Sequence, residues 1–333
     1  MLPPRKPDSM LRSRYRIIET VGQGGMGSIY QAEDTRLTGR FCAIKEIQID
    51  PKNLPSHQSQ AREQFRREAS VLARLDHPNL PKVSDFFSDG NRDYLVMDFV
   101  RGEDLRQKIE EAKSNGRFIP EQQVMDWVSQ LCDALSYLHS QSPPVLHRDV
   151  KPANIKLTPD GLIKLVDFGL VKLMTPDEDR TITVLQGRGT AFYIPLEQYG
   201  GDTGHTDARS DIYSLGATLY HLLTNEPPAE AKTRFLQPTA LVPPRSLNPH
   251  LTARTEQAIQ WALSMHPDDR PPSVQVLQDF LISNDPLNLL PPREGDTVFS
   301  QIAPVNRILG AIVLGLLLFS VVITFFSPMV PVY

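Results

Sequence analysis

The stretch HRDVKPANIKLTPDGLIKLVDFG, residues 147–169, decides the fold of this chain. Two apolar segments within it, 154–158 and 162–168, flank a Pro-Asp-Gly turn and therefore predict a β-hairpin. The ends of a hairpin lie together, so we expect Asp149, Asn154 and Asp167 to converge. Such oxygen donors suit a hard divalent cation such as Mg²⁺, with one carboxylate left to handle a proton. A plain acidic hairpin with solvated ends would explain one aspartate but not this ordered set.

The composition is that of an ordinary globular protein with one large or two small domains. The chain has 333 residues, of which 40% are hydrophobic and 22% charged. A formal net charge of −4 gives no support for a nucleic-acid partner. Cys42 and Cys132 form no CxxC pair, which argues against structural zinc or a disulfide scaffold and fits a reducing compartment. Residues 1–16 contain no apolar run, so no secretory signal is expected.

Four glycines, Gly22, Gly24, Gly25 and Gly27, lie between two β-like segments, residues 15–21 and 28–32. In a dinucleotide-binding fold such glycines lead into a helix, whereas here they lead into SIYQA, which is typical of a strand. A glycine-rich hairpin lets backbone N–H groups lie close over phosphates. The alternative is a purely structural hairpin.

Lys45 lies within the apolar strand FCAIKEIQI, residues 41–49, and needs a partner for its charge if it is buried. The next segment, residues 60–75, has the spacing of a helix whose inward face carries Phe65, Ala69 and Leu72. Glu68 falls on that same face. We therefore predict an ion pair between Lys45 and Glu68; the alternative is that Glu68 is one more surface charge.

Apolar periodicity predicts the remaining core elements. They are a buried strand at 94–100 and helices at 120–140, 207–224, 253–264 and 273–282. Asp211 is expected to be a buried acceptor that anchors a loop, and Arg270 a buried ion-pair partner. The polar segment 170–188 has no regular pattern, which is typical of a functional or mobile loop.

The C-terminal part has the pattern of a membrane anchor. A proline-containing linker, 283–307, precedes 19 uncharged residues, 308–326, which as a helix would span about 28 Å. Arg307 precedes this segment and no Lys or Arg follows it, so the large domain is expected in the cytoplasm and residues 327–333 outside it. A small-xxx-small pair, Ala311 and Gly315, is compatible with helix pairing and a homodimer.

Together these motifs resemble the protein-kinase superfamily, specifically bacterial serine/threonine kinases of the eukaryotic-like (Hanks) type. GQGGMG, AIK, the helix glutamate, HRDVKPAN and DFG occur in family order over residues 15–282. The resemblance implies an α+β, bilobal fold with a small β-rich N-lobe, 15–98, and a larger helical C-lobe, 102–282. To this the chain adds an N-terminal extension, 1–14, and one C-terminal transmembrane helix.

The resemblance also implies the roles of individual residues. Gly22, Gly24 and Gly27 cover the ATP phosphates. Lys45, held by Glu68, contacts the α- and β-phosphates. Asp149 accepts or orients the proton of the substrate hydroxyl, Lys151 steadies the transferred phosphoryl group, and Asn154 and Asp167 hold Mg²⁺, or Mn²⁺ in its place. The implied nucleotide contacts are Val21, Gly22, Gly24, Gly27, Ile29, Ala43, Lys45, Met97, Asp98, Val100, Asp104, Asn154 and Asp167.

Other positions bear on specificity and regulation. Lys151 with the Gly189-Thr190 pair is similar to the serine/threonine branch. Arg148 resembles the arginine of kinases whose activation segment is phosphorylated, with Thr181 and Thr183 as candidate sites.

Two departures from the family pattern concern the activation segment and the adenine site. Pro195-Leu196-Glu197 replaces Ala-Pro-Glu, with Glu197 still able to pair with Arg270. Lys156 stands where an apolar residue usually lies beneath adenine, so its stem would pack there and its ammonium would snorkel outward.

The main hypothesis is an active, single-pass kinase of the plasma (inner) membrane. It would use ATP and Mg²⁺ to phosphorylate Ser/Thr of proteins, and itself on the activation segment. One alternative is a membrane-anchored pseudokinase or nucleotide-binding scaffold, which loss of Lys45, Asp149 or Asp167 would have favoured. A second is a small-molecule kinase, which the KPAN motif and the Glu197 and Arg270 positions disfavour.

Overall fold

The N-lobe of the protein is built on a curled six-stranded antiparallel sheet. The computed structural model describes residues 3–24, 27–48, 55–167, 190–199 and 206–282, which belong to the unit Met1–Asp285. The strand order is β1-β2-β3-β4-β6-β5. The strands are β1 Met10–Leu11, β2 Tyr15–Gly24, β3 Gly27–Asp34, β4 Phe41–Gln48, β5 Val83–Asp89 and β6 Arg92–Asp98.

Burial alternates along β3 and β4, as it does when one face of a sheet covers a core. The side chains of that face form a continuous apolar cluster. Its members are Leu11, Tyr15, Ile17, Tyr30, Ala32, Cys42, Ile44, Phe87, Tyr94 and Val96. Since Leu11 belongs to this cluster and β1 pairs with β2, part of the predicted extension, 1–14, is structurally integral to the N-lobe.

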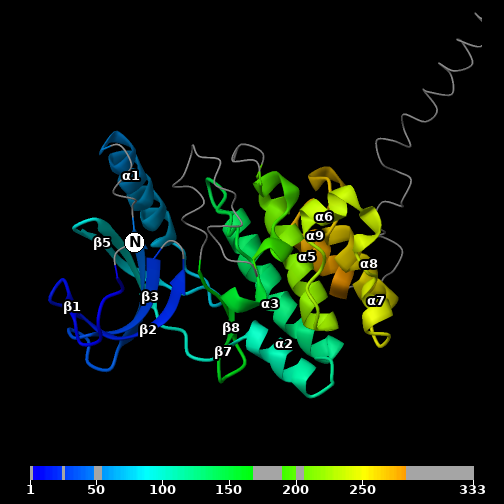
Figure 1. The fold of residues 1–333 in the computed structure, drawn as a ribbon, viewed down its shortest axis with the longest axis horizontal. Helices are drawn as coiled ribbons and strands as arrows, with labels where there is room; N and C mark the ends of the chain where they lie inside the picture. Colours follow the sequence, from blue (N-terminus) through cyan, green and yellow to red (C-terminus); the bar gives the residue numbers. More distant parts are fainter. Residues whose placement is uncertain (1–2, 25–26, 49–54, 168–189, 200–205, 283–333) are drawn as a thin grey trace, which may run out of the picture. The chain divides into compact units, whose positions relative to one another are not determined.

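The helix predicted at 60–75 is α1, Pro55–Leu72. Phe65, Ala69 and Leu72 are all buried, which confirms the predicted inward face. Figure 1 shows α1 beside the strands, apart from the helices that follow in the chain, and α1 contacts β5.

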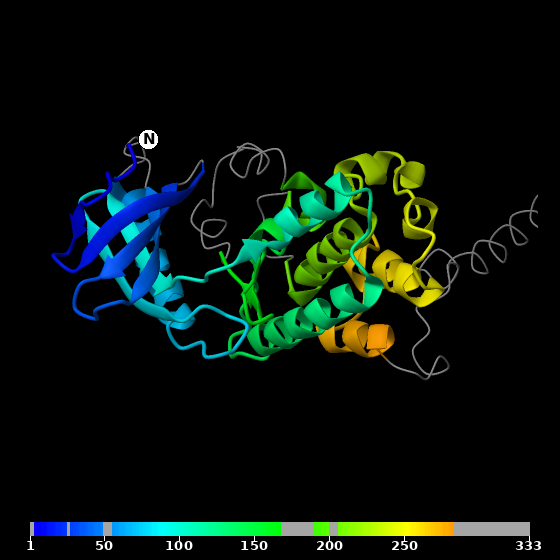
Figure 2. The same ribbon diagram turned by 90° about the horizontal axis from the view of Figure 1, so that it is seen from below.

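The C-lobe is helical, and its predicted helices are confirmed. They are α3 Glu121–His139, α5 Ala208–Thr224, α8 Ala253–Ala262 and α9 Val274–Ile282, to which the structure adds α2 Leu105–Ser114, α6 Ala231–Leu236 and α7 Pro244–Leu247. Helix α3 packs along α9, the orange helix of Figure 2, and also contacts α5. Helix α5 approaches α8 so closely that a Cβ on Gly216 would lie 2.7 Å from the Cβ of Ala262.

The hairpin predicted from residues 147–169 is also confirmed. Strands β8 Ile155–Leu157 and β9 Ile163–Leu165 are antiparallel. Gly161, with φ +83°, has the left-handed backbone that suits the turn between them. A two-residue strand, β7 Glu103–Asp104, completes this small sheet.

Several predictions lie outside the described residues. These are the activation-segment threonines Thr181 and Thr183, the linker 283–307, the apolar span 308–326 and the tail 327–333. Within the described part of the chain, no helix has both the length and the apolar character needed to cross a membrane.

Candidate active site

The loop that begins at His147 is mounted on helix α5 by Asp211. This carboxylate is fully buried and accepts hydrogen bonds from the backbone N–H groups of His147 (2.9 Å) and Arg148 (2.7 Å). His139 Nε2 lies 2.9 Å from it. Burial alone would raise the pKa of Asp211, but hydrogen bonds and the charges of the two histidines lower it, so the carboxylate stays ionised. The predicted loop-anchoring role of Asp211 is confirmed.

Asp149, Lys151 and Asn154 form one hydrogen-bonded group at the end of this loop. Lys151 Nζ lies 2.9 Å from Asp149 Oδ2 and 3.1 Å from Thr190 Oγ1. Asn154 Nδ2 donates to the backbone oxygen of Asp149 at 2.9 Å and to its Oδ2 at 2.8 Å. These three predicted site residues therefore lie together, and Thr190 joins them from a segment 39 residues away from Lys151.

Asp167 joins the site from the far end of the hairpin. Val166 N donates to the backbone oxygen of Asn154 at 2.8 Å, which holds the two hairpin ends together. Lys45 Nζ lies 3.0 Å from Asp167 Oδ1. Two residues of the stretch, Arg148 (φ 62°) and Asp167 (φ 64°), have left-handed backbone, which is uncommon for residues other than glycine. The predicted convergence thus includes Lys45 of the N-lobe.

The predicted ion pair of Lys45 with Glu68 is not formed in this structure. Lys45 contacts Asp167 instead, and Glu68 Oε1 accepts a hydrogen bond from Gln64 at 3.2 Å. Among the described residues, Glu68 Oε2 is buried without a hydrogen-bond partner. Burial raises the pKa of Glu68 to about 7, partly offset by Gln64 and by the charge of Arg148. Because no cation lies beside the Glu68 carboxyl group to offset its burial, the protonated form is favoured.

Glu68 and Arg148 both line a cavity of about 650 Å³ between α1 and the loop that precedes the site. Val71 and Leu72 contribute from α1, and Pro143 and Leu146 are among the residues on the other wall. Burial lowers the pKa of Arg148, while the charges of Asp211 and Glu68 raise it. The inward glutamate of α1 therefore faces the arginine that precedes Asp149.

The predicted glycine hairpin is present, with Gly24 paired opposite Gly27. Gly22 pairs with Ile29, and Ile29 pairs in turn with Lys45 on β4. Gly27 and Ile29 therefore lie on β3, directly beside the strand that carries Lys45, and Gly22 and Gly24 lie on β2, one strand further away.

Two of the implied nucleotide contacts, Ala43 and Met97, are cross-strand partners on β4 and β6. Asp104, another of the implied nucleotide contacts, is the N-cap of α2: its Oδ1 accepts a hydrogen bond from Gln107 N at 3.0 Å. Lys156 directs its ammonium toward Gly102 O (3.4 Å) and Asp104 Oδ2 (3.9 Å), which matches the expected snorkelling.

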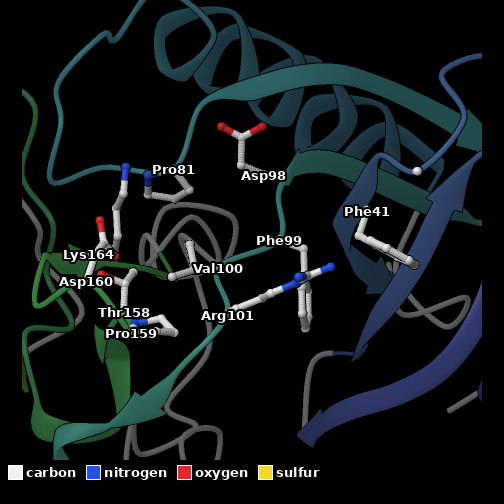
Figure 3. A pocket seen from close by; sticks show the side chains of 11 residues that line it. Phe41, Pro81, Asp98, Phe99, Val100, Arg101, Thr158, Pro159, Asp160 and Lys164 are labelled. Carbon is white, nitrogen blue, oxygen red and sulfur yellow. The ribbon is translucent and has the colours of Figure 1, made fainter.

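A separate pocket of about 380 Å³ lies along the chain segment that joins the lobes (Figure 3). Asp98 and Val100 line it, with Pro81 and Lys164 on the C-lobe side. Figure 3 shows Arg101 extending toward Phe41, and its guanidinium carbon lies 5.4 Å from the ring centroid. Since none of the described glycine-turn residues lines this pocket, we do not assign it to the nucleotide.

Residues 190–198 are fastened to the C-lobe at both ends. Arg270 Nη1 and Nη2 lie 2.6 Å and 3.0 Å from the two carboxylate oxygens of Glu197, which confirms the predicted pair. Tyr193 OH lies 2.6 Å from His221 Nδ1, and Ser214 Oγ donates to Tyr193 O at 2.8 Å. Sequence reasoning missed the Tyr193–His221 contact because no local pattern links residues 28 positions apart.

The donor set at the hairpin ends fits a hard cation. Asn154 directs its Nδ2 to Asp149, so its amide oxygen is the atom left to bind a metal. With the Asp167 carboxylate it would supply oxygen ligands, which Mg²⁺ prefers. Within the described residues no group of three or more His, Cys, Asp or Glu side chains could hold a metal ion. A site of this kind would therefore need ligands from a bound phosphate as well.

Residues 15–282 match the family described as "Protein kinase domain". The chain belongs to this family. The kinase domain is 34% identical over 268 residues to a probable serine/threonine-protein kinase of Clostridium acetobutylicum, covering 79% of this chain and 38% of that relative. It is 33% identical over 273 residues to serine/threonine-protein kinase PknB of Mycolicibacterium smegmatis, covering 78% and 41%. The chain thus spans about two fifths of the length of these curated relatives.

Solved structures show the same bilobal fold. The apo form of PpkA-294 aligns with a TM-score of 0.69 at 26% identity and covers 84% of this chain and 99% of that one. The PknI kinase domain of Mycobacterium tuberculosis aligns with a TM-score of 0.62 at 28% identity, covering 83% and 98%. The expected fold, a β-rich N-lobe with a helical C-lobe, is therefore confirmed for the kinase domain.

Proposed function

We propose that this chain is an active ATP-dependent protein serine/threonine kinase. The observation that carries the proposal is a pair of side-chain groups, Asp149 with Lys151 and Asn154, and Asp167 with Lys45. The backbone hydrogen bond from Val166 N to Asn154 O holds the two groups together at the hairpin ends. A pseudokinase would be expected to lack at least one of these groups. The relatives named as serine/threonine-protein kinases support the same activity.

In the proposed reaction, the γ-phosphoryl group of ATP passes to a Ser or Thr hydroxyl, ADP leaves, and the hydroxyl proton is released. Asp149 would orient that hydroxyl and accept its proton. Lys151, 2.9 Å from Asp149, would place a positive charge beside the transferred group. Lys45 would bind the α- and β-phosphates, for which it has to leave Asp167 or share it. Mg²⁺ held by Asn154 and Asp167 would neutralise phosphate charge.

The hydrogen bond from Lys151 to Thr190 supports the choice of Ser/Thr over Tyr. It ties the segment 190–198 to Lys151, the residue that also contacts Asp149. A short Ser or Thr side chain brings its hydroxyl to Asp149 only if the peptide backbone lies close to that segment.

A labelled-ATP assay of the full chain tests the proposal. We expect Mg²⁺-dependent transfer of label to the chain itself or to a generic protein substrate. Asp149→Asn should abolish transfer and still bind a fluorescent ATP analogue, because the exchange keeps the shape of the loop and removes the base. Absence of transfer in the wild-type chain, with nucleotide still bound, would favour the pseudokinase.

We also propose autophosphorylation on Thr181 or Thr183, with Arg148 as the phosphate's partner. A phosphate beside Arg148 would compete with Glu68 for the positive charge of the Arg148 guanidinium. This competition would favour the movement of Glu68 toward Lys45. Mass spectrometry of active protein should find at least one of these threonines modified. Full activity in a chain with Ala at both positions would contradict the proposal.

The membrane anchor is proposed from the sequence alone. The uncharged segment 308–326, preceded by Arg307, supports a single-pass protein of the plasma (inner) membrane with its kinase domain in the cytoplasm. Fractionation of cells should place the full chain in the membrane pellet, and deletion of 308–326 should move it to the supernatant. A chain that stays in the supernatant with the segment intact would refute the anchor.

A further inference from the structure

Residues 3–11, here called the strap, lie before the first residue of the family match and are nevertheless part of the N-lobe. Asp8 N donates to Ile17 O at 2.8 Å, and Ile17 N donates to Ser9 O at 3.0 Å. These bonds continue into β1, which pairs with β2 and places Leu11, 1% exposed, in the apolar core. The strap is thus held by both backbone bonds and core packing.

Beneath the strap lies a buried carboxylate, Glu46. We call Glu46 and its three partners Tyr30, Arg92 and Tyr94 the hub. The Glu46 side chain is fully buried and forms an ion pair with Arg92 at 2.9 Å. Its Oε2 also accepts from Tyr30 OH at 3.0 Å and from Tyr94 OH at 3.2 Å. These three partners compensate the buried negative charge of Glu46, and removal of one would leave that charge poorly compensated.

The strap closes the hub through Arg5 and Pro3. Arg5 N donates to Tyr30 OH and Arg5 Nε donates to Tyr94 OH, each at 2.9 Å. Each tyrosine hydroxyl therefore accepts a hydrogen bond from Arg5 and donates one to Glu46, so the two hydroxyls act as relays between Arg5 and the carboxylate. Arg92, the ion-pair partner of Glu46, donates a hydrogen bond from its Nη2 to Pro3 O at 2.8 Å.

The hub is joined through the backbone to the predicted nucleotide site. Glu46 follows Lys45 on β4, so the two side chains point to opposite faces of the strand. Gly27 of the glycine turn, with φ +147°, lies so close to Glu46 that a Cβ on it would be 2.0 Å from Glu46 O. The backbone that the hub holds in place therefore carries Lys45 and also supports the end of the glycine turn.

We propose that the strap is a positioning element of the nucleotide site, with Arg5 and Glu46 as its positioning residues. Arg5 holds the two relays, the relays hold Glu46, and Glu46 fixes the stretch of β4 to which Lys45 and Gly27 belong. The proposal rests on the proposed function, in which Lys45 and the glycine turn bind ATP. It extends the functional unit to residues outside the family match.

Arg5→Ala in the full chain tests the proposal, with Arg12→Ala as the matched control. Arg12 also stacks on an N-lobe ring, with its guanidinium carbon 5.2 Å from the Phe87 centroid, and Phe87 is not one of the four hub residues. We expect Arg5→Ala to raise KM for ATP roughly three- to tenfold, since the hydrogen bond from Arg5 Nε to Tyr94 OH is lost while the backbone bond from Arg5 N to Tyr30 OH stays. KM for the protein substrate should stay unchanged, and Arg12→Ala should change neither constant by more than about twofold.

Binding of a fluorescent ATP analogue is a second readout that does not depend on phosphoryl transfer. It separates failure of the inference from failure of the proposed function. Tyr30→Phe, which removes one relay hydroxyl and keeps the ring, should weaken binding of the analogue in the same direction. A chain lacking residues 2–7 should bind it weakly and recover with a synthetic peptide of residues 1–9, but not with that peptide carrying Arg5→Ala.

Three results would overturn the proposal. The first is an Arg5→Ala variant whose affinity for the analogue matches that of Arg12→Ala. The second is a change confined to the unfolding temperature, which would make the strap merely structural. The third is unaltered nucleotide affinity in the chain without residues 2–7.

Discussion

Replacing Glu68 by glutamine is expected to stabilise the protein at alkaline pH and to weaken catalysis at the same time. Glu68 Oε2 is buried without a hydrogen-bond partner among the described residues, and burial raises the pKa of Glu68 from 4.5 to about 7. Glutamine has nearly the same shape and carries no charge, so it avoids the penalty of a buried carboxylate.

The sign of the pH dependence follows from linkage. Because the folded-state pKa is the higher one, the folded protein binds more protons than the unfolded chain between pH 4.5 and about 7. The stability associated with protonated Glu68 is complete below pH 4.5 and is lost as the pH rises through 7. A pKa difference of about 2.5 corresponds to about 3 kcal/mol at most.

The assay is unfolding of the full chain in urea, followed by circular dichroism at pH 5 and at pH 8. Glu68→Gln should exceed the wild type by up to ~3 kcal/mol at pH 8 and by much less at pH 5. The control is Glu63→Gln, an exposed glutamate of the same helix paired with Arg67, which should shift stability by under ~0.5 kcal/mol.

Phosphoryl transfer provides the second half of the prediction. A neutral residue at position 68 cannot draw Lys45 away from Asp167 by charge, so kcat/KM for ATP should fall about tenfold or more. Equal stability of wild type and Glu68→Gln at both pH values would show that Glu68 is solvated or paired in solution. That result would contradict a buried Glu68 carboxyl group without a cation beside it.

Three further substitutions follow from other buried contacts. Arg270→Gln leaves Glu197 uncompensated and should lower the free energy of unfolding by about 3–5 kcal/mol in urea titration; an unchanged midpoint would mean that the pair contributes nothing. Gly102→Ala puts a Cβ 2.1 Å from Leu157 O at φ +126°, so thermal unfolding should show a loss of about 1–3 kcal/mol, and wild-type stability would contradict the strain. Burial lowers the pKa of His221 from 6.5 to about 4, so stability should be lost as the pH falls through this window, by up to about 1.4 kcal/mol per pH unit. His221→Phe should flatten that slope in unfolding experiments, and an unaltered slope would assign the titration to another group.

Sequence reasoning succeeded where local patterns determine the structure. The apolar spacing of α3 and the Pro-Asp-Gly turn between β8 and β9 each specify an element with little help from distant residues. Asp211 and the Glu197–Arg270 pair were predictable because a charged residue in a buried setting requires a partner.

Distant contacts decided what the sequence left open. The strap is short, polar and rich in proline, and only its contacts with β2 and the hub give it a fixed structure. Helix α2 has just two buried residues, Leu105 and Ile109, too few to show a helical period. The partner of Lys45 depends on where α1 packs relative to β4 and to Asp167, and no residue pattern within either element specifies that position.

The left-handed backbone at Arg148 and Asp167 places backbone strain at two points of the catalytic stretch. Left-handed geometry costs an arginine roughly 1–2 kcal/mol, and an aspartate less because its short side chain tolerates it. At Arg148 the strained backbone is stabilised from the C-lobe, by the two hydrogen bonds that backbone N–H groups donate to Asp211. At Asp167 the strained backbone is stabilised from the N-lobe, by the ion pair with Lys45. The two strained residues are therefore stabilised by different lobes. A ligand that draws Lys45 toward phosphate removes the contact at Asp167 and leaves the contacts at Arg148 in place.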